Sequence, residues 1–220
     1  MLIDLHHSSL MDQVYRRQRH FYNATRKFYF LGRDALIDDL DPPPGGLILE
    51  IGCGTGRNLI AAAQRYPHAE CFGIDISSVM LDTARRAVRG SALQHRMHLE
   101  LGDATRLAPS AIFGVKKFDR VFLSYALSMI PGWRQAITEA LDVLAPGGRL
   151  HIVDFGNQHE LPAWFQIALR RWLALFHVQP RLDLANAVRR RCACGGASAD
   201  VQSLYRGYAT YIVVRWTGAA

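Results

Sequence analysis

The fold is decided by residues 47–56, which read Leu47-Ile48-Leu49-Glu50-Ile51-Gly52-Cys53-Gly54-Thr55-Gly56. The mostly apolar first half predicts a buried strand, and glycines at every second position then allow a sharp turn. Because a glycine has no Cβ atom, the backbone of such a loop can lie directly against a ligand. The stretch therefore predicts a strand, a loop that contacts a nucleotide-type ligand, and a helix.

The loop departs from the dinucleotide-binding fingerprint. That fingerprint has a further glycine three residues after its second one, and Arg57 occupies this position. A nicotinamide-dependent oxidoreductase is therefore disfavoured. A tight turn without a ligand is the other interpretation of a lone glycine loop, so later parts of the chain have to decide between them.

Four later stretches, rich in apolar residues, predict further strands. They are residues 71–75, 97–101, 118–125 and 144–154. The helical patterns between them predict a doubly wound parallel sheet. Ligands of such sheets lie beyond the carboxyl ends of the strands. The residues expected at that edge are Gly52, Gly54, Asp75, Asp103 and Ser124.

The glycine run, with Glu50 before it and acidic strand ends after it, resembles motif I of the class I S-adenosylmethionine (SAM) methyltransferases. Asp75 is predicted to bind the ribose, and the resemblance implies that Asp103 accepts from the adenine amino group. Either aspartate alone could instead cap a helix. Glu50 either touches the ligand or braces the loop amides. The predicted cofactor-binding residues are Glu50, Gly52, Gly54, Gly56, Asp75, Ile76, Asp103, Ala104 and Ser124.

The length of 220 residues, 50% of them hydrophobic, predicts a single α/β domain. We expect a Rossmann-like, seven-stranded, mostly parallel sheet, with an antiparallel hairpin formed by residues 198–201 and 205–214. The parts expected along the chain are an amphipathic helical segment (1–44), a SAM-binding core (45–155), and lid helices with the closing hairpin (156–220).

The four cysteines are Cys53, Cys71, Cys192 and Cys194. Two fall on predicted core strands, and the other two are too close together to form a paired zinc motif, so we expect reduced thiols and no metal. The sequence has no apolar stretch long enough to span a bilayer and no pattern typical of a signal peptide. These features predict a cytoplasmic protein.

The chain is basic, with 26 Lys and Arg residues against 19 Asp and Glu residues and a formal net charge of +7. Basic proteins favour anionic surfaces. Nucleic acid is disfavoured as a partner, because no nucleic-acid-binding module is recognisable. An anionic membrane surface is the stronger candidate, so we expect peripheral membrane association.

Two amphipathic segments support that expectation. Residues 11–40 interleave aromatic residues with arginines at helical spacing, as in helices that lie among lipid headgroups. A cover helix with a solvated basic face is the alternative for this segment, and Gly32 is expected to break or cap it. Residues 161–176 have a wide apolar arc. They could form a lid whose outer aromatics meet lipid, or a dimer interface.

Several segments are similar to the diacylglyceryl-homoserine N-methyltransferases, which make betaine lipids. The similarity is carried by residues 11–20, 25–34, 124–134, 153–156, 176–178 and 205–208, and so it spans nearly the whole chain. It implies three successive methyl transfers from SAM to the homoserine amine of a diacylglycerol ether lipid. The run of residues 189–194, with three arginines and two cysteines, has no counterpart that the similarity explains.

The acceptor amine must lose a proton before it is methylated, and aromatic rings stabilise a growing methylammonium. Tyr22, Tyr29, His177 and Tyr205 are candidate proton acceptors, and an aromatic cage is predicted from Tyr22, Tyr29, Tyr125 and Tyr208. Arg26 or Arg33 is expected to bind a carboxylate of SAM or of the homoserine headgroup. The alternatives are methylation of phosphatidylethanolamine, methylation of a soluble metabolite, and a noncatalytic SAM- or lipid-binding module.

Overall fold

The computed structural model describes residues 30–176 and 178–216. It contains a seven-stranded sheet with the strand order β3-β2-β1-β4-β5-β7-β6. The strands are β1 (Leu47–Ile51), β2 (Glu70–Asp75), β3 (Met97–Leu101), β4 (Phe118–Ser124), β5 (Leu144–Phe155), β6 (Ala197–Leu204) and β7 (Ala209–Trp216). Strands β1 to β5 pair in parallel, whereas β7 is antiparallel to β5 and to β6. The predicted fold class is confirmed.

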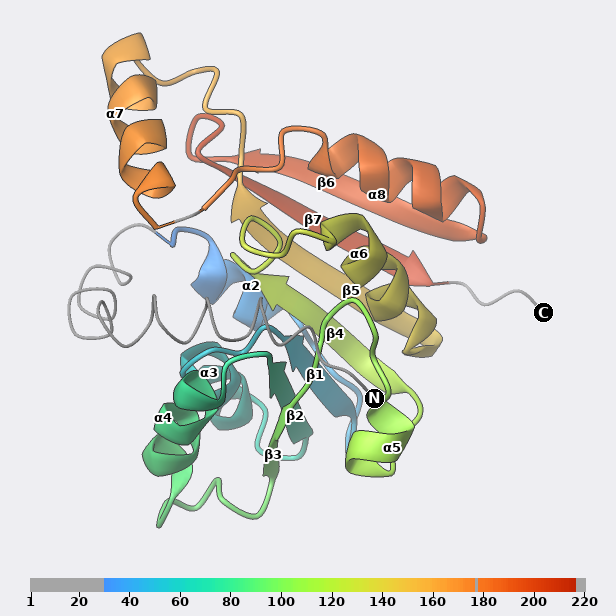
Figure 1. Ribbon diagram of the computed structural model, residues 1–220. Helices are drawn as coiled ribbons and strands as arrows, with labels where there is room; N and C mark the ends of the chain where they lie inside the picture. Colours follow the sequence, from blue (N-terminus) through green and yellow to red (C-terminus); the bar gives the residue numbers. More distant parts are fainter. Residues whose placement is uncertain (1–29, 177, 217–220) are drawn as a thin grey trace.

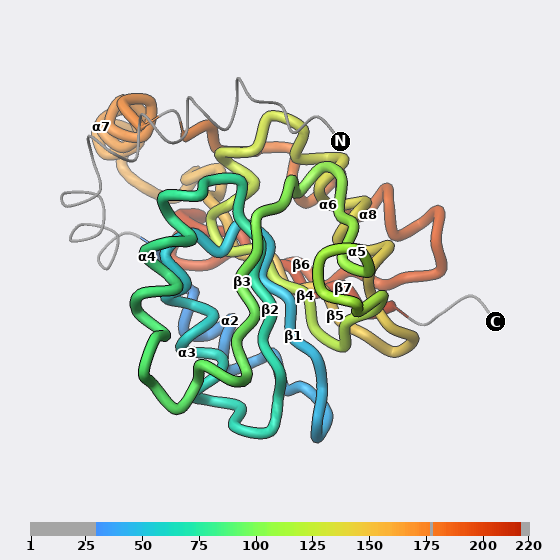
Figure 2. The backbone as a smooth tube through the Cα atoms, turned by 60° about the horizontal axis from the view of Figure 1, so that its bottom comes forward, coloured from blue at the N-terminus to red at the C-terminus, as the bar shows by residue number. Residues whose placement is uncertain are grey.

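Helices cover both faces of the sheet (Figures 1 and 2). They are α2 (Arg33–Asp39), α3 (Arg57–Arg65), α4 (Ser78–Val88), α5 (Pro109–Phe113), α6 (Trp133–Asp142), α7 (Ala163–Ala174) and α8 (Leu184–Ala193). One apolar core includes Leu36, Leu59 and Leu81 of α2, α3 and α4. A second core includes Trp133 of α6 and Val188 of α8. The two cores lie on opposite faces of the sheet.

The direction of the strand order changes at β1. This strand pairs with β2 on one side and with β4 on the other, so the chain leaves β1 and β4 toward different halves of the sheet. In doubly wound sheets the crevice at such a switch point is the ligand site. The fold therefore places the glycine loop after β1 at the expected position.

The N-terminal amphipathic segment is described only from residue 30 onward. Gly32 was expected to break or cap this segment, and within the described part it caps a helix. Gly32 has φ 85° and precedes α2, which begins at Arg33. A Cβ atom at Gly32 would lie 3.0 Å from the Leu204 side chain, so this close approach also favours glycine.

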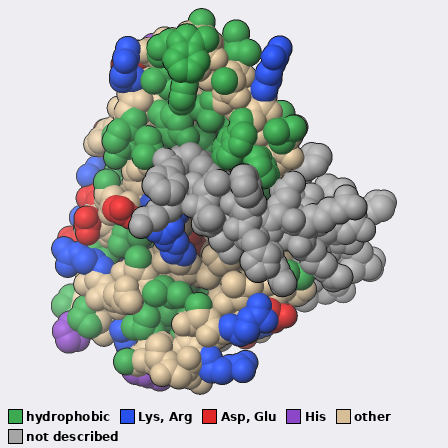
Figure 3. Space-filling model, turned by 90° about the vertical axis from the view of Figure 1, so that its left-hand side faces the viewer, with side chains coloured by type: hydrophobic (Ala, Val, Ile, Leu, Met, Phe, Trp, Pro, Cys, Tyr) green, Lys and Arg blue, Asp and Glu red, His purple; other side chains and the backbone are tan. Residues whose placement is uncertain are grey.

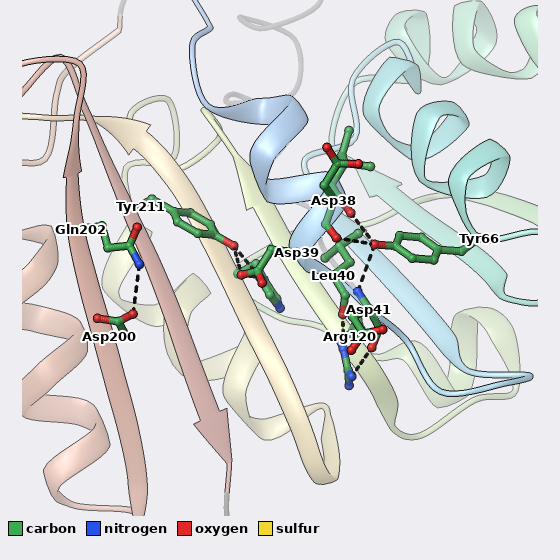
Figure 4. Close-up of polar contacts among 11 residues, drawn as sticks. Asp38, Asp39, Leu40, Asp41, Tyr66, Arg120, Asp200, Gln202 and Tyr211 are labelled. Carbon is green, nitrogen blue, oxygen red and sulfur yellow. Dashed lines mark hydrogen bonds and ion pairs between the residues drawn. The ribbon is translucent and has the colours of Figure 1, made fainter.

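Side-chain hydrogen bonds tie α2 to the sheet and to α3 (Figure 4). The Tyr211 hydroxyl on β7 donates to Asp39 over 2.6 Å, and the Tyr66 hydroxyl donates to the Asp38 carbonyl over 2.8 Å. Arg120 on β4 donates to the backbone carbonyls of the two residues that follow α2. Helix α2 is therefore held against β4 and β7, and this fixes the position of Arg33 at its first turn.

The closing hairpin has a different boundary from the predicted one. Residues 205–208 form the turn, whereas the prediction placed residue 205 at the start of the second strand. Tyr205, Arg206 and Gly207 have φ values of 53°, 60° and 77°. Consecutive left-handed residues cannot continue a strand, and so β6 and β7 are separated here.

Candidate functional site

A cavity of about 620 Å³ lies at the carboxyl ends of the central strands. Most of the predicted cofactor-binding residues line it. They are Gly52 and Gly54 after β1, Asp75 and Ile76 at the end of β2, Asp103 and Ala104 after β3, and Ser124 at the end of β4. The loop after β4 and the start of α6 supply the opposite wall, including Ala126, Met129 and Gln135.

The glycine loop folds because its glycines adopt left-handed backbone angles. Gly52, Gly54 and Gly56 have φ values of 75°, 55° and 74°. The amides of Gly52 and Cys53 both donate to the Ile74 carbonyl over 2.9 Å, which ties the loop to β2. A Cβ atom on Gly52 would lie 2.8 Å from the Ala126 Cβ atom across the crevice. The loop therefore forms a cradle that only glycine keeps open.

Asp75 is part of the site and does not cap the following helix. One of its carboxylate oxygens accepts from the Gly54 amide over 2.7 Å, and the other accepts from the Ser77 amide over 2.9 Å. The N-cap of α4 is Ser77, whose hydroxyl accepts from the Met80 amide. Asp75 also lines the cavity, and its carboxylate is a group to which hydroxyl donors of a ligand can bond.

Asp103 also lies away from any helix start. Its Oδ1 atom accepts from the amide and the hydroxyl of Thr105, each over 2.8 Å, and α5 begins only at Pro109. This local turn orients a carboxylate that lines the cavity. The helix-cap interpretation is therefore wrong for both aspartates.

Glu50 and Gly56 support the loop from below. Glu50 is buried in β1, and its Oε1 atom accepts from the Asn58 side chain on α3 over 3.0 Å. Gly56 precedes α3, and a Cβ atom there would lie 3.0 Å from the Ala84 Cβ atom on α4. Neither residue is among the described residues that line the large cavity. Both positions are consistent with bracing, and their predicted contact with the cofactor stays a prediction.

Ser124 faces the cavities with a buried polar atom. Its side chain is 9% exposed, and among the described residues its Oγ atom has no hydrogen-bond partner. A buried hydroxyl without a partner is unfavourable, and a ligand that bonds it removes this cost. The glycine cradle, the two carboxylates and this hydroxyl together fit the ribose, adenine and sulfonium portions of SAM.

A smaller cavity of about 120 Å³ adjoins the glycine loop. It is lined by Gly52 to Thr55, Arg57, Asn58, Ser124, Phe30 and Arg33. Arg33 is buried, and its Nε atom donates to the Phe30 carbonyl over 3.0 Å. A guanidinium beside backbone amides suits a carboxylate, which the methionine portion of SAM carries. Arg33 was one of two arginines predicted for this role; Arg26 lies outside the described residues.

Tyr125 has contacts typical of a structural side chain. Its hydroxyl donates to the Leu31 carbonyl over 2.7 Å, and its ring stacks on Phe30 with a centroid distance of 4.3 Å. Phe155 meets the same ring edge-on at 4.7 Å. Burial raises the pKa of Tyr125 well above its ordinary value, so the hydroxyl keeps its proton at neutral pH. The catalytic role predicted for Tyr125 stays a prediction.

The other predicted catalytic residues lie apart or outside the described ranges. Tyr22, Tyr29 and His177 are outside them. Tyr205 is 53% exposed on the β6–β7 turn. Tyr208 is buried, and its ring lies 6.0 Å from that of Phe155. Two members of the predicted cage, Tyr125 and Tyr208, thus each meet the ring of Phe155 edge-on, and the cage itself stays a prediction.

Residues 127–130 of the cavity wall are held by groups that sequence reasoning did not single out. Arg181 donates to the carbonyls of Leu127 and Ile130 over 3.1 and 2.9 Å. The Gln179 amide donates to the Ser128 carbonyl, and the Ser128 amide donates to the buried carboxylate of Asp154. The segment between α7 and α8 is therefore tied to the cofactor cavity. No local sequence pattern points to this brace, because its partners are far apart in the chain.

The buried carboxyl group of Asp154 is expected to make the free energy of unfolding depend on pH. Burial raises its pKa from 3.8 to about 6, although two backbone amides act in the opposite direction. The pKa of Asp154 is therefore higher in the folded protein than in the unfolded chain. The resulting contribution to stability is fully present below the pKa of the unfolded chain, and it is lost as the pH rises through about 6. Between roughly pH 5 and pH 8, the wild type is expected to lose about 1–2 kcal/mol more unfolding free energy than Asp154→Asn. Urea unfolding at both pH values measures this difference; parallel profiles would contradict it.

The cysteines and the helices add two further findings. All four cysteines are free thiols, and burial raises the pKa of Cys71 to about 12. Among the described residues, no group of three or more His, Cys, Asp or Glu side chains is arranged to hold a metal ion. Within the same residues, the helices are too short or too polar to cross a bilayer.

Comparisons with known proteins agree with this geometry. Residues 48–148 match the family model of the methyltransferase domain. The ubiquinone/menaquinone biosynthesis C-methyltransferase of Cereibacter sphaeroides is 32% identical over 127 residues, which are 58% of this chain and 49% of that protein. The demethylmenaquinone methyltransferase of Symbiobacterium thermophilum is 37% identical over 107 residues, which are 48% and 41% of the two chains. The match thus spans about half the length of these relatives.

A solved structure extends the likeness of fold. Geranyl diphosphate methyltransferase in complex with SAM superposes with a TM-score of 0.63 at 15% identity, over 86% of this chain and 85% of that chain. The matched family region contains the glycine loop, Asp75, Asp103 and Ser124, which line the cavity. The family match, the relatives and the site agree that residues 48–148 form a domain similar to the class I SAM-dependent methyltransferases.

Proposed function

We propose that the protein transfers methyl groups from SAM to the amine of a diacylglyceryl-homoserine lipid and so makes a betaine lipid. The observation that supports a lipid as the acceptor is an apolar cavity of about 450 Å³ between α7 and the β6–β7 turn. Its lining is Leu31, Leu161, Phe165, Leu169, Trp172, Tyr205 and Tyr208. Hydrocarbon chains fit such walls, whereas a polar metabolite gains little from them.

The choice of a homoserine headgroup rests on the sequence resemblance of residues 11–34, 124–134 and 205–208. Most of these residues lie outside residues 48–148, the region that matches the methyltransferase-domain family model. A headgroup with a carboxylate also suits a basic protein with arginines near the cofactor loop. Peripheral attachment to a membrane follows from the proposal, because the acceptor is a membrane lipid.

When bound, SAM supplies a methyl carbon that an adjacent sulfonium activates, and the acceptor displaces the sulfur from this carbon in line. The protein therefore needs no covalent nucleophile, and its contribution is to position the reactants and exclude water. The glycine cradle, Asp75 and Asp103 hold and orient the nucleoside part, and Ser124 lies at the junction of both cavities. The acceptor nitrogen attacks with its lone pair, so a side chain or water must first take its proton.

Methylation of a ring carbon on a prenylated quinol is a second candidate. It is favoured by the identity of 32–37% with quinone methyltransferases over about half of the chain. A prenyl chain would also fit the apolar cavity. The two reactions differ at the acceptor atom, because one methylates nitrogen and the other methylates carbon.

An acceptor assay separates these candidates. The purified protein is incubated with SAM and one detergent-dispersed lipid: diacylglyceryl-homoserine, phosphatidylethanolamine or demethylmenaquinol. Mass spectrometry is expected to show gains of one, two and three methyl groups on the homoserine lipid, and Asp75→Ala serves as the impaired control. Methylation of only phosphatidylethanolamine or the quinol would overturn the proposed acceptor. Absence of transfer to every lipid would overturn a lipid methyltransferase.

A further inference from the structure

Helix α7 has apolar residues on its outer face as well as its inner face. Leu169 and Leu173 are buried. Trp164 is 71% exposed, Ile167 is 54% exposed, and Leu175, which ends the helix, is 70% exposed. Positions 164, 167, 171 and 175 fall on one side of an α-helix. Globular proteins seldom leave several large apolar side chains together in water, so this face is expected to meet a partner.

The charge on α7 indicates the kind of partner. Arg170 and Arg171 are its only charged residues, and both are exposed. Arg171 stands between Trp164 and Leu175 on the outer face, seven residues after one and four before the other. Figure 3 shows hydrophobic side chains gathered over the upper part of the molecule, where α7 lies, with Lys and Arg side chains on both flanks. A surface of this composition complements hydrocarbon beneath anionic headgroups.

The inner face of α7 continues the same apolar surface. Phe165, Leu169 and Trp172 line the apolar cavity opposite Tyr205 and Tyr208. The helix also lies beyond the carboxyl end of β5, on the side of the sheet edge that holds the cofactor cavity (Figure 1). A lipid that leaves a membrane at α7 would therefore meet an apolar cavity at once.

We propose that the α7 face, defined as Trp164, Ile167, Arg170, Arg171 and Leu175, docks on an anionic phospholipid surface. Trp164 and Leu175 insert among the headgroups, and the two arginines bind lipid phosphates. Its use in catalysis rests on the proposed lipid acceptor, whereas the docking itself is measured without SAM or acceptor.

The test is flotation with vesicles of phosphatidylcholine alone or mixed with phosphatidylglycerol. The wild type is expected to bind the mixed vesicles, and added salt is expected to weaken binding because ions screen exposed charges. Trp164→Ser/Leu175→Ser should reduce partitioning at least about ten-fold through lost apolar insertion. Leu182→Ser, which removes an apolar side chain that is 65% exposed outside this face, is the matched control and should bind as the wild type does.

A second pair of variants tests the charges. Arg171→Gln should reduce binding to the mixed vesicles about five-fold, since one arginine near an anionic surface contributes ~1 kcal/mol. Arg189→Gln removes an exposed arginine from α8, so this variant has the same net charge as Arg171→Gln. Because Arg189 lies outside the α7 face, its loss should have no effect on vesicle binding. Equal losses in both variants would show that total charge, and not the α7 face, governs binding.

Three further outcomes would overturn the docking surface. The first is no vesicle binding by the wild type, and the second is undiminished binding by Trp164→Ser/Leu175→Ser. The third is a dimer, seen by sedimentation velocity, that dissociates in the double variant, because the face would then belong to a second copy. Vesicle binding without methylation of any lipid would refute the proposed function alone. If the protein methylated a detergent-dispersed lipid but did not bind vesicles, the docking surface would be refuted and the proposed function would stand.

Discussion

Asp75→Ala is expected to weaken SAM binding at least about 30-fold while the protein stays folded. Hydrogen bonds to a charged group contribute roughly 1.5–3 kcal/mol each, and about 1.4 kcal/mol is a factor of ten in affinity. Asp75 lines the cavity, and its carboxylate also orders the amides of Gly54 and Ser77 at the mouth of the glycine loop. The substitution removes both the acceptor for the ribose and the brace of the loop. Isothermal titration calorimetry measures the affinity.

The matched control for this change is Asp82→Ala on α4. Asp82 is exposed, and its carboxylate lies 3.7 Å from the Arg85 guanidinium, a surface pair that contributes little. Its SAM affinity should equal that of the wild type. Asp75→Asn keeps the size of the side chain and loses the charge, so an intermediate affinity is expected. If Asp75→Ala bound SAM as tightly as Asp82→Ala, Asp75 would have no part in the site.

The sequence predicted the elements whose signals are local. Strands β1 to β5 followed from apolar stretches, and the glycine loop followed from residues 52–56. Asp75 and Asp103 could be placed at the cavity because the carboxyl ends of parallel strands meet at one edge. The helix cap at Gly32 was also predictable, since glycine is the residue that most readily takes a positive φ.

Features that depend on contacts distant in sequence could not be predicted. Arg181 is 54 residues from Leu127, whose carbonyl it binds, and no local pattern links the two. The β6–β7 turn was misplaced because Tyr205 and Arg206 are residue types that favour strands or helices, and here they adopt left-handed angles. Tertiary packing decided these positions against local preference.

Gly52→Ala is expected to have the larger effect on the cofactor site, with a loss of SAM affinity of about 100-fold or more. The left-handed φ of 75° costs alanine roughly 1–2 kcal/mol. The new methyl group would also lie 2.8 Å from the Ala126 Cβ atom, which is closer than carbon atoms approach without displacement. Either the glycine loop or the loop after β4 must move, and both line the cavity.

The two causes can be separated, because the atom that the new methyl group meets belongs to a single small side chain. Ala126→Gly removes that atom, so Gly52→Ala/Ala126→Gly keeps the backbone strain and loses the collision. The double variant should regain at least about ten-fold in SAM affinity over Gly52→Ala, since a steric conflict between two residues appears as a coupling energy of ~0.5–3 kcal/mol.

Two single variants make this comparison quantitative. Ala126→Gly alone should bind SAM within about three-fold of the wild type, because it removes only a methyl group from the cavity wall. Gly114→Ala places alanine at a φ of 71° with no atom within 4 Å, so it should lower the unfolding free energy by the strain alone and leave SAM affinity unchanged. If the double variant bound SAM no better than Gly52→Ala, the collision with Ala126 would be excluded as a cause. The need for glycine at position 52 would then rest on its backbone angle and on the ligand itself.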